Sequence, residues 1–226
     1  MFALPQVNAD PDAMVLVDTA AMAWEQTDTP GVSQKLLERV IDQEKGRETA
    51  LIKVDPGMTL PHDSLPQREE ILVLEGTLVD EHGTYGQYTF VLNPAGFKHT
   101  LSSPDGCVFY RKLRNPFRDD TQRLVIDTAK VEWQPFGHRA AEVVHFYRDP
   151  HGIEVSRFGE VFEHQQIPSH DHAMGEETLI VEGVLKDQMG SYGAGTWLRF
   201  PIGLEHAPFT EERRCKMFIR EGDLVW

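Results

Sequence analysis

The sequence carries one pattern twice, and this duplication limits the possible folds more than any other feature. Residues 69–76 (EEILVLEG) match residues 176–183 (EETLIVEG), 107 positions later. The same separation then holds for seven identical pairs: Asp80 and Asp187, Gly83 and Gly190, Tyr85 and Tyr192, Gly86 and Gly193, Pro94 and Pro201, Gly96 and Gly203, and His99 and His206. Chance identity does not keep one offset over such a stretch. We therefore predict an N-terminal domain at residues 1–113, a polar linker at 114–122 and a C-terminal domain at 123–226.

Each predicted domain consists of short apolar or alternating runs separated by turn residues. In the first domain these runs are residues 50–54, 71–74, 77–79, 89–92 and 108–110, and in the second they are 178–181, 196–200 and 216–219. Turns with Gly or Pro, at 55–57, 81–83 and 94–96, separate the runs. Residues 32–41 have some helical character, but their counterpart at 140–147 favours a strand. Evenly spaced short strands are typical of sandwiches and barrels, so the sequence predicts an all-β fold in which each domain is a sandwich or a barrel.

Composition excludes several classes of function. The chain has 226 residues and a net charge of −14, which argues against a nucleic-acid partner, because phosphate contacts need clustered Lys and Arg. The two cysteines are too few for a disulfide framework or a cysteine zinc finger. No signal peptide or membrane-spanning run is evident, so we expect a cytoplasmic protein with no membrane partner. Ten histidines are many for this length and favour metal or proton chemistry.

The second domain contains a candidate metal site. His170, His172 and Glu176 fall on even steps, so an extended chain would direct all three to the same face. His206 follows a Pro- and Gly-containing turn next to a predicted strand. Three imidazoles and one carboxylate are suitable ligands for Zn or Fe, and also for Mn or Ni, and they leave positions open for water or substrate. We predict that these four residues bind a divalent metal ion.

The first domain offers a weaker version of this site. His62, Glu69 and His99 take the corresponding places, but Ser64 stands where a second histidine would be. One extra residue between Ser64 and Glu69 also breaks the even alternation unless a bulge absorbs it. Three ligands and a water can still hold zinc. The alternative is a degenerate site that is retained as a polar core.

With both motifs in place, the chain resembles a cupin, and its duplication resembles a bicupin. The first cupin motif, G-x5-H-x-H-x3/4-E-x6-G, is matched by His170, His172, Glu176 and Gly183, although its leading glycine is absent. The second motif, G-x5-P-x-G-x2-H, is matched by residues 195–206, without the asparagine that usually follows. The finer pattern is similar to the cupin domain of ChrR-type anti-sigma factors over nearly the whole chain. This resemblance implies two tandem double-stranded β-helix, or jelly-roll, barrels.

The resemblance is less specific about activity than about fold. ChrR-type anti-sigma factors grip the sigma factor with an N-terminal zinc module, H-x3-C-x2-C, and no Cys or His precedes residue 50 here, so sigma-factor binding is not expected. One hypothesis is a metal-binding sensor of a small molecule or oxidant. Another is an Fe(II)-dependent dioxygenase of a small diketone, phenolic or carbonyl compound, and a third is a bicupin with structural zinc. Arg111, Arg199 and Arg220 could anchor an anionic substrate or be ion-paired, and pairing through sheet edges would give a homodimer.

Overall fold

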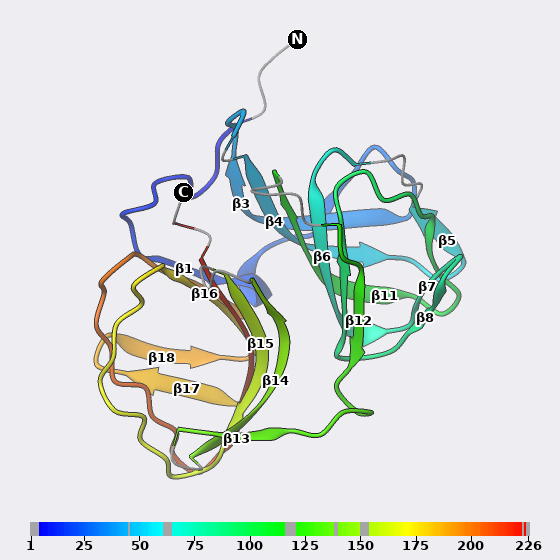
Figure 1. The fold of residues 1–226 in the computed structure, drawn as a ribbon. Coiled ribbons are helices and arrows are strands. Elements are labelled where there is room, and N and C mark those ends of the chain that lie inside the picture. The colour runs from blue at the N-terminus through cyan, green and yellow to red at the C-terminus, as the bar shows by residue number, and fades with distance from the viewer. Residues whose placement is uncertain are drawn as a thin grey trace. The chain divides into compact units, whose positions relative to one another are not determined.

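Almost all of the regular secondary structure in the described residues is β-strand, and the strands form two compact units (Figure 1). The computed structural model describes residues 5–44, 46–60, 65–115, 121–137, 140–149, 154–222 and 224. The first unit contains the described residues up to 9 and from 22 to 130, and the second contains residues 10–21 and the described residues from 131 onward. Together with the comparisons reported below, these two strand-rich units confirm the predicted all-β fold.

The first unit contains a seven-stranded sheet in the order β12-β9-β6-β11-β4-β3-β2 and a four-stranded sheet in the order β5-β10-β7-β8. Its strands are β2 (Glu25–Gln26), β3 (Val32–Val40), β4 (Arg47–Val54), β5 (Met58–Leu60), β6 (Arg68–Gly76), β7 (Leu78–Asp80), β8 (Gly83–Tyr85), β9 (Thr89–Asn93), β10 (Leu101–Ser103), β11 (Cys107–Arg114) and β12 (Leu124–Asp127). The run at residues 32–41 is thus a strand: β3 alternates side chains between two faces except at a bulge near Leu36.

The second unit repeats this arrangement with a seven-stranded sheet in the order β1-β19-β16-β20-β15-β14-β13 and a hairpin of β17 and β18. Its elements are β1 (Val15–Asp18), the 3-10 turn η1 (Thr19–Ala21), β13 (Gln134–Phe136), β14 (Ala141–Arg148), β15 (Val155–Val161), β16 (Glu176–Glu182), β17 (Val184–Asp187), β18 (Gly190–Gly193), β19 (Thr196–Phe200) and β20 (Cys215–Glu221). Within the described ranges, no helix is long and apolar enough to cross a membrane.

The two units exchange their first strands, which the sequence did not predict. β1 pairs antiparallel with β19, so the N-terminal strand completes the sheet of the second unit. β12, its counterpart in the second repeat, pairs with β9 and completes the sheet of the first unit. The compact units therefore differ from the predicted domains 1–113 and 123–226 at these two segments. Alternating apolar residues predict that a segment is a strand, but they do not specify the sheet in which it finds its partner.

Each unit has its own hydrophobic core between its two sheets. The first core includes Ile52, Val73 and Phe109, and the second includes Ile180 and Leu198. Sterics explain why a glycine ends each of the two matched segments, residues 69–76 and 176–183. Gly76 and Gly183 have φ of 74° and 77°, and a Cβ on either would collide with a backbone carbonyl oxygen of the neighbouring strand turn.

Candidate metal centre

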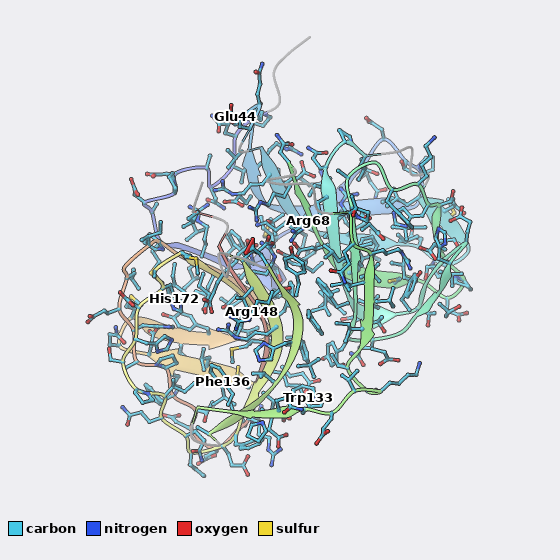
Figure 2. All side chains as sticks on the ribbon, viewed as in Figure 1. Glu44, Arg68, Trp133, Phe136, Arg148 and His172 are labelled. Carbon is cyan, nitrogen blue, oxygen red and sulfur yellow. The ribbon has the colours of Figure 1, made fainter. Side chains whose placement is uncertain are left out.

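Two histidines of the predicted site are joined by backbone pairing in the second barrel. The amide of His170 donates to the carbonyl of His206, and the amide of His206 donates to the carbonyl of His170, both at 3.0 Å. His172 lies two residues further on and is buried, as is His206, while His170 is partly exposed. Figure 2 labels His172 in this barrel. The antiparallel bridge thus sets three imidazoles beside one another.

The predicted alternation holds from His170 to His172 but is wrong from there to Glu176. The chain turns after His172, where the amide of Gly175 donates to the His172 carbonyl at 3.1 Å, and Gly175 has φ of 70°. Glu176 then begins β16. The turn brings Glu176 Oε2 to 3.3 Å from His172 Nδ1. The converging group of His170, His172 and His206 does not include Glu176, because His172 faces His206 with its other ring nitrogen, Nε2. A glycine with a left-handed backbone allows this reversal, which a period-two pattern cannot describe.

The distances among the imidazoles suit a metal ion. One ring nitrogen each of His170, His172 and His206 lies within 4.8 Å of the others. The Nε2 atoms of His172 and His206 are 3.0 Å apart. Two nitrogens that each lie about 2.1 Å from one ion, at a right angle, would be separated by about 3.0 Å. The donor set of this chain therefore fits a divalent metal of the zinc or iron type.

Hydrogen bonds to the opposite ring nitrogens support this assignment. His170 Nδ1 is 2.9 Å from the Pro168 carbonyl, and His206 Nδ1 is 3.2 Å from Asp187 Oδ2. Each acceptor favours a proton on Nδ1 and leaves the Nε2 lone pair for a metal. Burial lowers the pKa of His206, against the opposing effects of Glu176 and Asp187, and the neighbouring His172 and His170 lower it further. His206 is thus favoured in the neutral form that can ligate a metal.

Two charged residues that the sequence did not single out extend the site. Glu221 lies in β20 opposite Glu176, and one carboxylate oxygen of each falls with a His172 nitrogen inside a second group of 4.8 Å. Arg157 Nη2 pairs with Glu221 Oε1 at 2.6 Å and lies 3.8 Å from Glu176 Oε2. Thr178 donates its hydroxyl to Glu176 Oε1 at 2.8 Å. Neither Glu221 nor Arg157 belongs to a sequence motif with fixed spacing. Their position in the site could be predicted only from the pairing of strands β15, β20 and β16.

A cavity of about 420 Å³ opens above these residues inside the second barrel. Its polar lining residues are His170, His172, His206, Glu176, Arg157, Glu221, Glu160, Ser169, Asp171 and Thr178. Most of the other lining side chains are apolar, among them Val143, Leu185, Leu198, Phe200, Met217 and Ile219. A concave, largely apolar cavity with a few convergent polar groups is the usual form of a small-molecule site.

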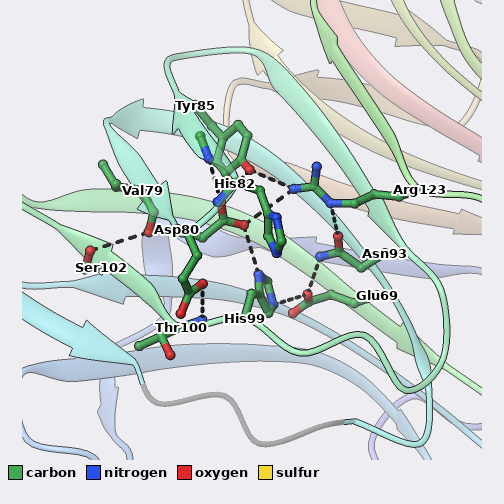
Figure 3. Close-up of polar contacts among 12 residues, drawn as sticks. Glu69, Val79, Asp80, His82, Tyr85, Asn93, His99, Thr100, Ser102 and Arg123 are labelled. Carbon is green, nitrogen blue, oxygen red and sulfur yellow. Dashed lines mark hydrogen bonds and ion pairs between the residues drawn. The ribbon is translucent and has the colours of Figure 1, made fainter.

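The equivalent position of the first barrel holds a closed hydrogen-bonded cluster (Figure 3). His99 lies between two carboxylates, with Nε2 3.0 Å from Glu69 Oε2 and Nδ1 3.3 Å from Asp80 Oδ2. Asn93 donates to the same Glu69 oxygen at 2.9 Å. Arg123, from the segment leading into β12, donates to Asn93 Oδ1 at 3.1 Å and to the Tyr85 hydroxyl at 2.7 Å.

Arg123 gives this cluster a cation supplied by the chain itself. Its guanidinium lies 3.5 Å from Asp80 Oδ2 and over the ring of Phe97. The strand repeat places Met14 at the corresponding position of the second unit, where it packs against the core. The exchanged strands therefore bring a cation to one barrel and an apolar side chain to the other. Of the predicted secondary site, Glu69 and His99 lie together, whereas His62 falls outside the described residues.

The pKa values of the equivalent histidines His99 and His206 are shifted in opposite directions. Burial lowers the pKa of His99, but hydrogen bonds and charge from Glu69 and Asp80 outweigh burial and raise it above its usual value. The raised pKa shifts His99 towards the imidazolium form, which has no lone pair for a metal. Among the described residues of the first barrel, no group of three potential ligands converges as in the second.

We expect Asp187→Asn to weaken metal binding about 10- to 100-fold, because an outer-shell acceptor orients its ligand. The asparagine keeps an oxygen for the turn amides of Met189 and Gly190, but its NH₂ group cannot accept the His206 Nδ1 proton. Asp80→Asn is the matched control, since Asp80 makes the same contacts in the first barrel. Competition against a chelator measures both affinities. Equal affinities of the two variants would contradict the role of Asp187.

The remaining candidate residues have structural partners. Arg220 pairs with Glu154 at 2.6 Å, and Arg111 lies 3.6 Å from Glu48. Arg199 donates to backbone carbonyls of the N-terminal segment. Cys107 and Cys215 are buried, and burial raises the pKa of both thiols to about 12. A thiol so shifted stays protonated and unreactive at neutral pH.

Two strand-exchanged jelly-roll barrels, with a histidine cluster and a carboxylate inside one of them, define a duplicated cupin, or bicupin. The chain belongs to the ChrR cupin-like domain family, whose model matches residues 12–116 and again residues 121–225. Both matches agree with the repeat in the sequence and confirm the resemblance inferred from it. No curated protein sequence matches this chain.

Solved structures have the same fold at low sequence identity. A "putative dioxygenase" from Nostoc punctiforme PCC 73102 superposes with a TM-score of 0.79 at 13% identity, covering 96% of this chain and 85% of that one. The protein Ylba from E. coli gives 0.71 at 9% identity, covering 97% and 95%. The oxalate decarboxylase of Lactobacillus farciminis, in a formate complex, gives 0.68 at 11% identity, covering 93% and 86%. Such identities establish the fold alone.

Proposed function

We propose that this bicupin binds a small organic molecule or an oxidant at a divalent metal centre of three histidines and one glutamate, and acts as a ligand-binding or sensor protein. The observation that carries the proposal is the cavity of about 420 Å³ that places His170, His172, His206 and Glu176 against an otherwise largely apolar wall. Zinc or iron is the expected metal, and manganese or nickel would suit the same donors. When bound, the metal would supply a Lewis-acid position for an oxygen atom of the ligand.

Different residues of the cavity would recognise different parts of a ligand. Apolar side chains such as Leu198 and Met217 favour a ligand with a hydrocarbon or aromatic body, because their burial removes apolar surface from water. The paired charges of Arg157 and Glu221 provide a donor and an acceptor beside the ligand's polar end. His206 is kept in place by Asp187 and by its backbone bridge to His170. Structural zinc sites normally lack such an open cavity.

Titration of cobalt-loaded protein with acetylacetone or catechol tests the proposal. We expect the visible absorption of the cobalt to change saturably, because an oxygen of the probe would enter its coordination. The same probes should leave the spectrum of the metal-loaded Met217→Trp variant unchanged, since Met217 lines the cavity and a larger ring there would take up its volume. A wild-type spectrum that is indifferent to every diketone, phenol and carbonyl probe would exclude this function.

A second candidate is an Fe(II)-dependent dioxygenase acting on a small diketone, phenolic or carbonyl compound. The specific observation in its favour is the Arg157–Glu221 pair beside Glu176, because a charged donor and acceptor next to the metal could orient a substrate and hold a proton. The similarity to the Nostoc protein named as a dioxygenase is compatible with this reading. Oxygen uptake by iron-reconstituted protein over a substrate panel separates the two functions. Saturable binding without oxygen consumption supports the sensor, and uptake that depends on substrate and is lost in Glu221→Gln supports the enzyme.

A further inference from the structure

The first barrel retains a cavity at the place where the second barrel has its ligand cavity. This cavity measures about 430 Å³. Its lining residues Gln34 and Ile52 are cross-strand partners, as are Val143 and Gly159 in the lining of the second cavity. Arg111 in β11 takes the register position that Ile219 has in β20. The two cavities are therefore equivalent spaces of the duplicated fold.

The lining of this cavity has become polar. Gln34 stands where the second barrel has Val143, and Arg111 stands where it has Ile219. The remaining polar lining residues are Gln26, Thr27, Asp28, Thr29 and Arg39. Neither Glu69 nor His99, the two described candidate metal ligands of the first barrel, lines the cavity. A ligand of this space would thus be held by hydrogen bonds and charge, without a metal.

Two guanidinium groups converge in the cavity and share one carboxylate. Arg39 Nε donates to Glu48 Oε2 at 2.8 Å, and Arg111 Nη2 lies 3.6 Å from Glu48 Oε1. The side chains of both arginines are 14% exposed, and that of Glu48 is 21% exposed. Each guanidinium has five N–H donors, so one carboxylate occupies only a minority of the ten. The other charged residue in the lining, Asp28, is exposed.

The rest of the wall indicates what kind of anion fits. Val32, Ile52 and Leu60 supply apolar surface to the same cavity. A cavity of about 430 Å³ is much larger than a single inorganic oxyanion needs. An apolar wall favours a carbon skeleton, and planar guanidinium groups favour a carboxylate, which they can bind through two parallel hydrogen bonds.

We propose that the first barrel binds a small organic carboxylate in this cavity through Arg39 and Arg111. This site is separate from the metal centre and does not depend on the function proposed for it. Glu48 holds the arginines in place in the absence of ligand and competes with the ligand carboxylate for their donors. The duplicated chain would then carry two ligand sites of different chemistry, one that uses a metal and one that uses arginine.

Calorimetric titration of the full chain with succinate and benzoate tests this site, with benzamide as the uncharged analogue and inorganic phosphate as the alternative anion. Titrations are repeated in a His206→Ala background, so that carboxylate binding at the metal centre does not contribute. We expect a carboxylate to bind, Arg111→Met to weaken it about tenfold or more, and Glu48→Gln to strengthen it several-fold. Lys53→Met is the matched control, because Lys53 is an exposed cation on the adjacent strand β4 and its loss should change nothing.

The gain in affinity of Glu48→Gln is the sharpest result, because a misfolded variant could not produce it. The proposal is overturned if neither succinate nor benzoate binds, or if Arg111→Met and Lys53→Met bind them equally well. Benzamide binding as tightly as benzoate would show that charge has no part in recognition. Phosphate binding in the absence of carboxylate binding would also overturn it, since the site would then select an inorganic anion.

Discussion

Replacing His206 by alanine is expected to remove the divalent metal from the second barrel. His206 supplies a neutral imidazole 3.0 Å from that of His172, and no other described histidine can take its place in the cluster. Loss of an outer-shell partner already costs about 10- to 100-fold in metal affinity, so loss of a ligand should cost at least about 100-fold. His172→Ala should have the same effect. Elemental analysis of protein dialysed against a weak chelator measures the occupancy.

His99→Ala is the matched control, because it removes the equivalent histidine of the first barrel. We expect this variant to keep one metal ion per chain, since His99 is held between Glu69 and Asp80 and its cluster already contains the cation of Arg123. His62→Ala should likewise cost little. Full occupancy in both His172→Ala and His206→Ala would refute the assignment of the metal centre.

Glu38→Ala is expected to destabilise the first unit by about 3–5 kcal/mol. Arg47 forms two hydrogen bonds with the Glu38 carboxylate, at 2.9 and 3.0 Å, and Lys112 Nζ lies 3.6 Å from it. Side-chain exposure is at most 3% for all three residues. The substitution removes this carboxylate from two buried cations, and removing one partner of a buried ion pair is strongly unfavourable. Urea unfolding of the full chain, followed by circular dichroism, measures the change in the free energy of unfolding relative to the wild type.

Glu44→Ala is the control for the charge change, because Glu44 is an exposed acid of the same unit. Its effect should stay within about 0.5 kcal/mol. Replacing the three buried charges together, as Glu38→Leu, Arg47→Met and Lys112→Met, should recover much of the lost stability, since buried ion networks can be exchanged for apolar side chains of similar volume. A free energy of unfolding for Glu38→Ala within 1 kcal/mol of the wild type would mean that water or other groups satisfy both cations.

Most of the fold could be predicted from the sequence because the chain repeats itself. The run at residues 196–200 is the strand Thr196–Phe200 without any shift of its ends, and the other predicted runs lie within or almost within strands. The exchange of β1 and β12 could not be predicted. Both repeats have a similar apolar pattern at this strand, ending in Asp18 and Asp127, so local pattern does not distinguish pairing within a repeat from pairing across repeats.

The candidate site could be predicted only in part, for a similar reason. Motif spacing identified His170, His172 and His206, which the structure brings within one group. It gave no signal for Glu221, which reaches the site because β20 lies beside β16. It also gave none for Arg123, which reaches the first barrel through the exchanged strand. Side chains that enter a site through sheet pairing follow the topology and leave no fixed spacing in the sequence.

The exchanged strands have a consequence for how the protein is made. During synthesis the first barrel cannot complete its sheet until β12 has left the ribosome, although all its other strands precede the linker. The N-terminal strand β1 must wait longer, because its partner β19 is among the last strands to be translated. Pairing over such sequence distances is slow, and an unpaired strand invites contacts with other nascent chains. The halves of this chain therefore complete each other's sheets, and in a gene cut at the linker each barrel would have to pair with its own first strand in place of the exchanged one.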